Sequence, residues 1–533
     1  MPKNRLSIYC VIIIILLVQF ALRAINPTAQ AFFWDENRHI TRAASILEGT
    51  HPAKESNGKF LLYVYLAPFH PSRQIALHVS RTAVALFSLI GSAAAFALAR
   101  RLFGLSAALV AILFYAFVPF ALFYERMVLA DGMAGAIATL AAYACVRLAQ
   151  KPSYRWAMLA GALAALASMA KVTVGFASVF LPILAGYTIG QHPTSQKQTI
   201  PQWVIARWRH YWWYWVAAGI TYIVFWLPTL VPAFISGLQG EHYVLIDATS
   251  LDTSFLSEND STRYNEFHRQ IATMLSWPML IAMLGIIGIT LWKYPRRAWL
   301  LIGWIALIWV PTAVLVWRTQ TRYLMAGVLP LSILLGGGTS IITQWKGWQQ
   351  WGGKKIAWML IGLFFVSWVS GFAAPFAYHA INDPTALTVT RWDNRDYFQS
   401  PWNGYGLLES LQYLQEYGQR GENNAVEVMM VAHMCPFMDL YEFDNVQWTC
   451  IIDDETNSKD YNGEIGHPMW RNATQFALEH DNEHVYLILE QHRNTLEIPT
   501  IPFEHPKLIW KEIKRFQRPH NGLWVTVWEV YSQ

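Results

Sequence analysis

Long uninterrupted runs of apolar residues dominate the first three quarters of this 533-residue chain. Most are about 20 residues long, the length that an α-helix needs to cross the hydrocarbon core of a bilayer. Charged residues make up 14% of the chain, whereas a soluble domain usually carries about 25%. The two runs between 155 and 190 also fit one long kinked helix. We therefore predict a polytopic α-helical membrane protein with about 11 crossings, at residues 7–25, 78–98, 104–123, 131–149, 155–170, 172–190, 212–233, 271–291, 298–317, 323–344 and 355–376.

The basic residues of the short loops predict how the chain crosses the membrane. They recur in every second loop, and cytoplasmic loops are the ones that carry excess Lys and Arg. The N-terminus is then cytoplasmic, and residues 32–77, 234–270 and 377–533 are exoplasmic. The net charge of +5 comes largely from these loops, so it does not indicate nucleic acid binding. The loop residues are Lys3, Arg5, Arg100, Arg101, Arg147, Lys151, Arg155, Lys197, Arg207, Arg209, Lys293, Arg296, Arg297, Lys346, Lys354 and Lys355.

The first apolar run has a second interpretation. Residues 1–31 also resemble a cleaved signal peptide, with Ala29, Gln30 and Ala31 as the cleavage site. Cleavage there would leave the sidedness of everything downstream unchanged. In both cases we expect a multi-pass protein of the plasma membrane.

Composition divides the chain into two predicted domains. Residues 1–376 form the transmembrane domain, in which 32–77 is a first outer loop with an amphipathic surface helix and 234–270 is a second large outer loop. Residues 377–533 regain charge, and their β-rich and amphipathic segments predict a small exoplasmic α/β domain. A disulfide between Cys435 and Cys450 is permitted there, but the sequence does not show whether they meet. The predicted strands are VEVMMVA, VQWTCII, HVYLILE and LWVTVWEV, and the predicted helices are LLESLQYLQEYG and WRNATQFALEH.

Two acidic positions on the predicted outer side are candidates for chemistry. Asp35 and Glu36 are adjacent carboxylates just after the first apolar run, where a lipid headgroup would lie. Asp131 begins the fourth predicted span. An ordinary role at a helix N-terminus also fits each of them, because carboxylates are favourable there. Two outer acids leave open a divalent cation, Mg²⁺ or Mn²⁺, although hard cations usually take more oxygen ligands than these.

Basic residues on the outer side run against the general charge pattern of the loops. Arg126, Arg318 and Arg322 lie in predicted outer turns, and Lys171 interrupts an apolar stretch at membrane depth. An ionisable group at such a depth is a functional candidate, although a Lys near a span end can also extend to the interface. Arg grips phosphate oxygens with parallel donors, so together these residues suit a phosphate. Candidate substrate contacts are Arg81 and His39.

Six segments in order resemble the GT-C membrane glycosyltransferases. The closest resemblance is to glycosyltransferase family 39, the dolichyl-phosphate-mannose–protein mannosyltransferases, and to the lipid A aminoarabinose transferases. It covers about residues 5–376, and the tail segment DYFQSPWNGYGLLESLQYLQ resembles bacterial members with a C-terminal soluble domain. The segments are WDENRHITRAASILEG, GKFLLYVYLAPF, SRTAVALFSLIGSAAAFALARRLFG, ERMVLADGMAG, AKVTVGFASVFLPIL and RYLMAGVLPLSILLGGG.

The resemblance implies a polyprenyl-phosphate-linked sugar as donor and a lipid, glycan or protein hydroxyl as acceptor, with membrane lipids around the chain. Asp35 would act as general base for an inverting attack. Glu36 would orient the loop or the acceptor, and Asp131 would serve the acceptor side. Lys171 and Arg322, with Arg126 and Arg318, would bind the donor phosphate.

Other functions find less support in the sequence. No Walker motif, G-x-S-x-G elbow or H-E-x-x-H motif is present, so ATP-driven transport and serine hydrolysis have no support. A secondary transporter would place acids near the bilayer midplane, often within inverted repeats. A non-catalytic scaffold would not require the outer acids and arginines. A glycan polymerase or ligase stays a near alternative because it shares the lipid-linked donor.

Overall fold

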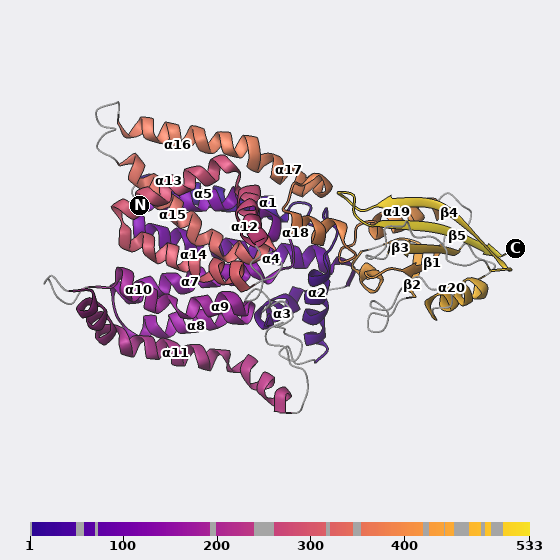
Figure 1. Cartoon of the computed structure of the whole chain (residues 1–533), viewed down its shortest axis with the longest axis horizontal. Helices are drawn as coiled ribbons and strands as arrows, with labels where there is room; N and C mark the ends of the chain where they lie inside the picture. The colour runs from indigo at the N-terminus through magenta and orange to yellow at the C-terminus, as the bar shows by residue number, and fades with distance from the viewer. Residues whose placement is uncertain are drawn as a thin grey trace. The chain divides into compact units, whose positions relative to one another are not determined.

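The computed structural model describes most of the chain, in two compact units (Figure 1). The helical unit comprises residues 1–27, 39–70 and 79–383, and the mixed unit comprises 28–38, 71–78 and 384–533. The segment that carries Asp35 and Glu36 is therefore grouped with the C-terminal sheet. The described residues are 3–49, 58–69, 73–191, 199–238, 261–315, 320–344, 353–418, 426–441, 443–451, 468–480, 485–491 and 505–532.

The helical unit consists of helices that follow the apolar runs, because a helix satisfies its own backbone hydrogen bonds in hydrocarbon. Several runs are broken into two helices. The helices are α1 (Lys3–Ala24), α3 (Phe60–Leu66), α4 (Arg73–Phe103), α5 (Leu105–Phe117), α6 (Pro119–Tyr124), α7 (Ala130–Gln150), α8 (Tyr154–Ala170), α9 (Val172–Val179), α10 (Leu181–Ile189), α11 (Ile200–Leu238), α12 (Ser261–Leu275), α13 (Trp277–Lys293), α14 (Pro295–Leu315), η4 (Thr321–Gly327), α15 (Val328–Thr343), α16 (Lys354–Trp368), the π-helical η6 (Val369–Ala373) and α17 (Ala374–Asn382). Helix α2 (Trp34–Leu47) begins in the mixed unit and continues into the helical one.

Seven described helices are long and apolar enough to span a membrane, or eight if the bent pair α12–α13 counts as one span. We expected about 11 from runs of spanning length, and the described helices account for eight of these. The other three are 104–123, which forms α5 and α6, 155–170, which forms α8, and 298–317, which forms α14 up to Leu315 and then leaves the described residues. An apolar run need not be one straight helix: α5 ends before Pro119, and α8 has only 17 residues.

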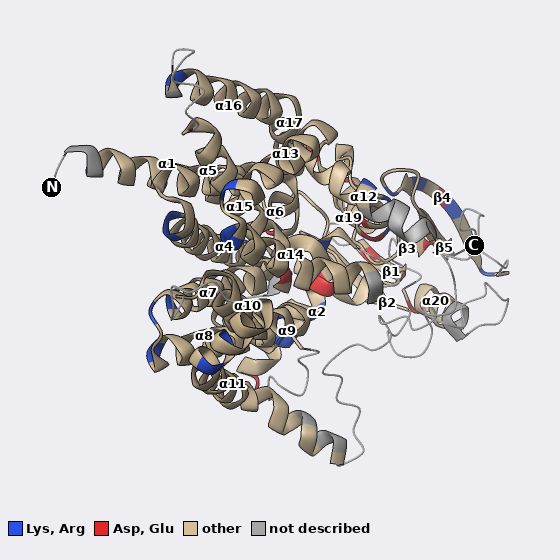
Figure 2. Cartoon of the chain, turned by 60° about the vertical axis from the view of Figure 1, so that its left-hand side comes forward, with Lys and Arg blue, Asp and Glu red and all other residues tan. Residues whose placement is uncertain are grey.

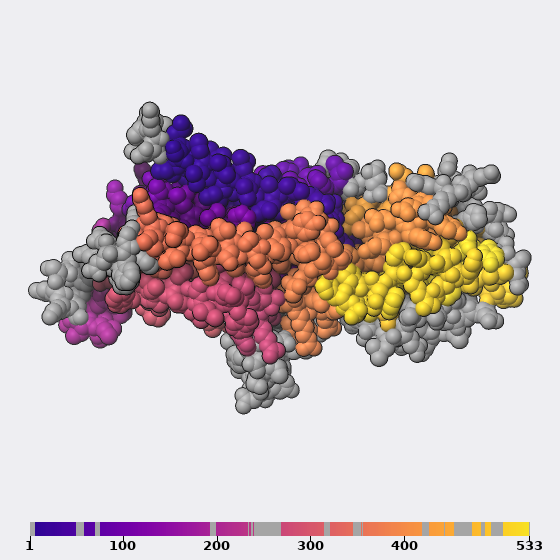
Figure 3. Space-filling view, turned by 90° about the horizontal axis from the view of Figure 1, so that it is seen from above, coloured from indigo at the N-terminus to yellow at the C-terminus, as the bar shows by residue number. Residues whose placement is uncertain are grey.

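The outer helices of this unit show that the protein is an integral, multi-pass membrane protein. Leu6 on α1, Phe234 on α11 and Leu363 on α16 are each more than 60% exposed, which a water-soluble surface would disfavour. Figure 3 shows α1, in indigo, and α16 with α17, in orange, along one face of the unit. Asn26 Nδ2 donates to the carbonyl oxygen of Ile381 at 2.9 Å, just beyond α1 and within α17.

The basic loops gather at one end of the helical unit, where the ribbon positions of Lys and Arg, in blue, lie at helix ends in Figure 2. Arg101 near the end of α4 donates to the Gln150 side chain at the end of α7, with 2.5 Å between Nε and Oε1. Arg297 at the start of α14 donates to the Leu102 carbonyl, also at 2.5 Å. This end is the one that the positive-inside rule assigns to the cytoplasm.

The predicted site residues Asp131, Lys171 and Arg322 lie at the other end. Asp131 begins α7, whose last residue is at the basic end, and Lys171 follows α8, which starts there. Arg322 precedes α15, whose final turn reaches the start of α5 through a 3.2 Å contact between the Ser340 and Ser106 hydroxyls. Helix topology therefore separates these three residues from the basic loops.

Small residues let α8 and α11 approach closely, as is common between helices in membranes. A Cβ built on Gly161 of α8 would overlap the carbonyl oxygen of Ala218 on α11 and lie 2.9 Å from its carbonyl carbon. At Gly219, the next residue of α11, a methyl group would meet no atom within 4 Å. The helix contact therefore depends on Gly161 and not on Gly219.

The mixed unit contains a five-stranded sheet in the order β2-β1-β3-β5-β4. Its strands are β1 (Val426–Val431), β2 (Val446–Cys450), β3 (Val485–Glu490), β4 (Leu508–Gln517) and β5 (Trp524–Ser532). The first three are parallel, and β5 and β4 run antiparallel. Helices α19 (Leu407–Gly418) and α20 (Pro468–Glu479) cover opposite faces (Figure 1).

Most predicted elements of this unit are confirmed. The four predicted strands are β1, β2, β3 and β5, and the two predicted helices are α19 and α20. The sequence missed the edge strand β4, because LIWKEIKRFQ carries four charged residues and only one of its residues is fully buried. Short additional turns are α18 (Arg391–Asn394) and the 3-10 helix η9 (Cys435–Leu440). Cys435 and Cys450 form a disulfide.

Gly161→Ala should destabilise the helical unit, because α8 and α11 must separate to admit the methyl group. Overpacking of this kind typically costs about 1–3 kcal/mol. Gly219→Ala is the matched control and should be neutral or stabilising by about 0.5–1 kcal/mol, since alanine is the better helix former. Thermal unfolding of both variants in the same detergent checks this, and an equal effect at both positions would contradict the close contact.

Candidate active site

Asp131 and Lys171 form an ion pair at a break between helices. Lys171 is the single residue between α8 and α9, and its backbone is extended, with φ −158° and ψ 115°. Its amide donates to Ala167 and its carbonyl accepts from Val174, so both helix ends are satisfied. The side chains are only 12% and 7% exposed for Lys171 and Asp131. Asp131 lies in the first turn of α7, where the helix dipole favours a carboxylate.

Arg322 joins this pair through an aromatic ring. The Lys171 Nζ lies 4.4 Å from the ring centroid of Tyr323, and the Arg322 guanidinium carbon lies 5.2 Å from it. Both cations thus contact the same ring, an arrangement that attracts positive charge to the π face. Trp309 of α14 holds η4 in place by donating to the Leu324 carbonyl at 2.9 Å. We call Asp131, Lys171, Arg322 and Tyr323 the cation cluster.

The cation cluster brings two positive groups and one carboxylate together around the Tyr323 ring. The sequence predicted Lys171 and Arg322 as phosphate ligands, and the fold brings them together. It did not predict Tyr323, although an aromatic residue directly after Arg322 was visible. Arg318, assigned to the same role, lies outside the described residues.

Beside the cluster, Glu125 is buried in a separate network. Its carboxylate accepts from Arg23 Nε at 2.6 Å and from the Tyr115 hydroxyl. A Cβ built on Gly132 would lie 3.0 Å from the Glu125 Cγ, so the residue after Asp131 packs directly on this side chain. The Arg23–Glu125 pair therefore supports the start of α7 and with it the position of Asp131.

Arg126 serves the end of helix α1. Its guanidinium donates to the carbonyls of four residues there, at 2.8–3.3 Å, and so satisfies acceptors that a helix C-terminus leaves unpaired. Burial, followed by the nearby Arg81 and Arg23, lowers the pKa of Arg126 to about 10, and the group stays charged at neutral pH. The four acceptors are Leu22, Arg23, Ile25 and Asn26.

The two predicted substrate contacts, Arg81 and His39, have different partners in the structure. Arg81 is fully buried and donates to the Pro27 carbonyl at 2.7 Å. His39 lies 2.6 Å from the Val128 carbonyl through Nδ1 and 2.9 Å from Lys59 Nζ through Nε2. Because an ammonium group can only donate, Nε2 accepts and Nδ1 carries the proton that is donated to Val128. Lys59 was not among the predicted residues.

Asp35 and Glu36 belong to the mixed unit, in the first turn of α2. The Glu36 carboxylate accepts from the backbone amide of Phe33 at 3.0 Å, and the Glu36 amide donates to the Phe33 carbonyl at 2.9 Å. This is the reach-back half of a capping box, so Glu36 stabilises the helix start. Asp35 is half-buried beside it. The two adjacent acids therefore differ: Glu36 caps the helix through the Phe33 amide, and Asp35 does not make this contact.

The part of the chain that the structure describes contains no group of three or more His, Cys, Asp or Glu side chains that could hold a metal ion. We therefore name no metal ligands.

Comparisons with known proteins agree with this architecture. Residues 76–215 match the family described as dolichyl-phosphate-mannose-protein mannosyltransferase. No curated protein matches the chain. The structure of ArnT from Cupriavidus metallidurans bound to undecaprenyl phosphate is similar, with a TM-score of 0.51 and 14% identity over 99% of this chain and 98% of that one. The structure of the archaeal oligosaccharyltransferase AglB from Archaeoglobus fulgidus, in complex with an inhibitory peptide and a dolichol-phosphate, is also similar. Its TM-score is 0.51, with 10% identity over 92% of this chain and 70% of that one.

The chain is a GT-C-class membrane glycosyltransferase. The resemblance inferred from the sequence motifs is confirmed at the level of class. The family match includes Arg81, Arg126, Asp131 and Lys171 of this glycosyltransferase and ends before Arg322. The solved structures share 10–14% identity with it and support the fold alone.

Arg126→Ala should lower the stability of this glycosyltransferase, because several carbonyls at the end of α1 lose a charged donor. A hydrogen bond to a charged group contributes about 1.5–3 kcal/mol, and Arg126→Lys should restore part of it. Arg155→Ala changes an exposed arginine at the basic end and is the control. Thermal unfolding of the three variants checks this, and identical midpoints for Arg126→Ala and Arg155→Ala would refute the capping role.

Proposed function

We propose that this glycosyltransferase transfers a sugar from a polyprenyl-phosphate-linked donor to an acceptor hydroxyl at the exoplasmic membrane face, with inversion. The observation that carries the proposal is the cation cluster, in which Lys171 and Arg322 contact one ring. Two cations at membrane depth are costly unless they are used, so their grouping supports an anionic ligand in the membrane. The similar ArnT and AglB structures hold undecaprenyl phosphate and a dolichol-phosphate.

Lys171 and Arg322 are assigned to the donor phosphate. As the bond between the anomeric carbon and the phosphate oxygen breaks, the leaving lipid phosphate gains negative charge. Cations already held in place stabilise that charge more in the transition state than in the ground state, which lowers the barrier. No nucleotide is needed, because the phosphosugar bond supplies the leaving group.

Asp131 is assigned to holding Lys171. The sequence suggested the acceptor side, but the ion pair with Lys171 supports a positioning role. The carboxylate holds the Lys171 ammonium in place through this ion pair. Arg126 is assigned to the end of α1, because its guanidinium already donates to four carbonyls there.

Asp35 is assigned as general base. Its carboxylate takes the proton from the acceptor hydroxyl while that oxygen attacks the anomeric carbon from the face opposite the phosphate, so the configuration inverts. Glu36 supports the helix start that carries Asp35, through its contact with the Phe33 amide. This division of roles follows from the different surroundings of the two neighbouring acids.

The exoplasmic location rests on the distribution of charge. The basic loops meet at one end of the helical unit, and the cation cluster lies at the end away from them. If the basic end is cytoplasmic, as the positive-inside rule expects, the cluster is exoplasmic.

Asp35→Asn should lower the rate of sugar transfer by roughly 10²–10⁴-fold, the usual contribution of a general base. Glu36→Gln is the matched control, because a Gln carbonyl can still accept from the Phe33 amide, and it should keep most activity. The measurement is release of undecaprenyl phosphate from radiolabelled undecaprenyl-phosphate mannose, glucose, galactose and aminoarabinose by purified protein. Full activity of Asp35→Asn on the sugar that the parent protein consumes would contradict the role of Asp35 as general base.

Lys171→Gln and Arg322→Gln should weaken binding of undecaprenyl phosphate by about 10- to 100-fold each, because each removes a charge-assisted hydrogen bond of about 1.5–3 kcal/mol. Lys293→Gln, at an exposed lysine of the basic end, should bind normally. Binding is measured with radiolabelled undecaprenyl phosphate on protein in nanodiscs. Arg126→Ala is measured in the same assay. If this variant alone binds undecaprenyl phosphate more weakly, Arg126 is the phosphate ligand and the assignment to the cation cluster is wrong.

A further inference from the structure

The segment just before Asp35 is held by backbone pairing within the mixed unit. Trp34 donates from its amide to the Trp402 carbonyl at 2.8 Å, and Gly404 donates to the Phe32 carbonyl at 3.0 Å. Between them, Phe33 forms an isolated antiparallel bridge with Asn403. The Phe32 amide donates to the Tyr441 hydroxyl at 3.0 Å. Residues 32–34 thus pair with a strand-like stretch more than 360 positions later in the chain.

Aromatic rings fix the same segment from the side. The Trp34 ring lies 5.5 Å from Trp402, 5.1 Å from His433 and 4.9 Å from Phe437, measured between centroids. Edge-to-face contacts with Trp402 and Phe437 and a stacked contact with His433 surround it. Aromatic pairs at such distances are worth about 0.5–1.5 kcal/mol each beyond the area that they bury. We call Trp34 and these three rings the Trp34 clamp.

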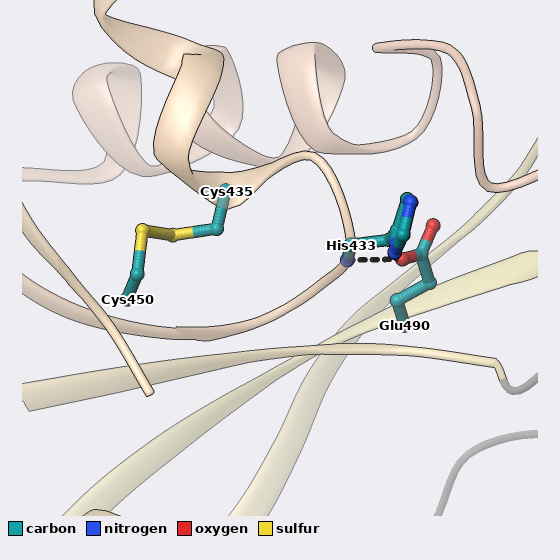
Figure 4. Close-up of a disulfide and its surroundings, with 4 residues drawn as sticks. All are labelled: His433, Cys435, Cys450 and Glu490. Atoms are coloured by element: carbon teal, nitrogen blue, oxygen red, sulfur yellow. Dashed lines mark hydrogen bonds between the residues drawn. A yellow bond between two sulfur atoms is a disulfide. The ribbon is translucent and has the colours of Figure 1, made fainter. Parts of the chain in front are cut away.

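A disulfide and a hydrogen bond hold two walls of the Trp34 clamp. The Cys435–Cys450 disulfide joins η9, which carries Phe437, to strand β2 (Figure 4). The Glu490 carboxylate at the end of β3 accepts from the His433 amide at 2.7 Å, also drawn in Figure 4. One wall is therefore tied to the edge strand β2 and the other to the central strand β3.

The wall formed by Trp402 is tied to the same carboxylate. Arg518 is fully buried, pairs with Glu490, and donates to the Tyr405 carbonyl at 2.7 Å and the Asn403 carbonyl at 3.4 Å. One buried ion pair thus supports both the His433 side and the Asn403 side of the clamp. Breaking such a pair leaves an uncompensated buried charge, so its loss would loosen both walls together.

We propose that the C-terminal sheet is the positioning device for Asp35, acting through the Trp34 clamp. This rests on the proposed function, in which Asp35 is the general base. Asp35 follows Trp34 directly, so any movement of the Trp34 ring or amide moves the carboxylate. A displacement of about 1 Å can reduce a rate by about 10²-fold. The disulfide and the Glu490–Arg518 pair are therefore positioning groups for the reaction, although neither touches substrate.

The first test separates positioning from donor binding. Trp34→Ala should lower kcat by about 10²-fold with little change in the KM for the donor, because the assigned phosphate ligands lie in the helical unit. Trp34→Phe keeps a ring in the clamp and should recover most of kcat. Trp448→Ala, at a partly buried tryptophan on β2 outside the clamp, is the matched control and should act like the parent protein. A normal kcat for Trp34→Ala would overturn the proposal.

The second test uses milder changes, because Trp34→Ala could unfold the mixed unit. Tyr441→Phe removes only the acceptor for the Phe32 amide and should lower kcat by about 5-fold, the equivalent of one hydrogen bond of about 1 kcal/mol. The double variant Cys435→Ala with Cys450→Ala should lower kcat and leave the donor KM unchanged. Hydrogen exchange on the purified full-length protein should quicken at the Phe32 and Trp34 amides and stay slow in β1 and β3.

The outcomes distinguish the two proposals. An inactive Asp35→Asn together with normal kcat in Trp34→Ala and in the double cysteine variant would keep the proposed base and reject the positioning role. An active Asp35→Asn would reject the base itself, whatever the clamp variants do. If exchange quickens throughout β1 and β3 in Trp34→Ala, Tyr441→Phe decides: a fall in kcat with a protected sheet supports the clamp, and a normal kcat rejects it.

Discussion

Buried charge has to be paired inside the helical unit, and the pairing of charges determines how its helix ends meet. Arg23 pairs with Glu125, and Arg126 donates to the carbonyls at the end of α1. Lys171 pairs with Asp131 where α8 gives way to α9. In a medium of low dielectric constant each group would be costly alone, so the helices can meet only where these partners coincide. The pairings thus hold α1, α7 and α8 together at the end opposite the basic loops.

The same constraint places the cation cluster at helix ends. The helix is interrupted at residue 171, where the backbone is extended. At this break the Lys171 side chain contacts both Asp131 and the Tyr323 ring. Arg322 reaches that ring from η4, another interruption of regular helix. Irregular backbone at membrane depth is tolerated where protein surrounds it. The cation cluster is therefore a product of two breaks, each supported by neighbouring helices.

The mixed unit provides a different kind of support. Its three parallel strands continue into the antiparallel strands β5 and β4, and its core packs α20 against residues such as Met429, Leu487 and Leu489. On this rigid base the disulfide and the Glu490–Arg518 pair fix the loops that contact Trp34. In our proposal the clamp gives the C-terminal domain a positioning role that composition alone did not suggest. It also links the half-buried Asp35 to strands far away in the sequence.

The sequence by itself determined the membrane class, the basic ends of the helices and four of the five strands, and it supplied the hypothesis that Lys171 and Arg322 bind phosphate. These depend on local hydropathy, charge and periodicity, which neighbouring residues carry. Tertiary structure decided the rest. It divided an apolar run at Pro119, placed the Arg126 guanidinium at the end of α1, joined Cys435 to Cys450, and placed residues 32–34 against 402–404. Each of these depends on contacts between groups distant in the chain, and such partners leave no periodic signal in a single sequence.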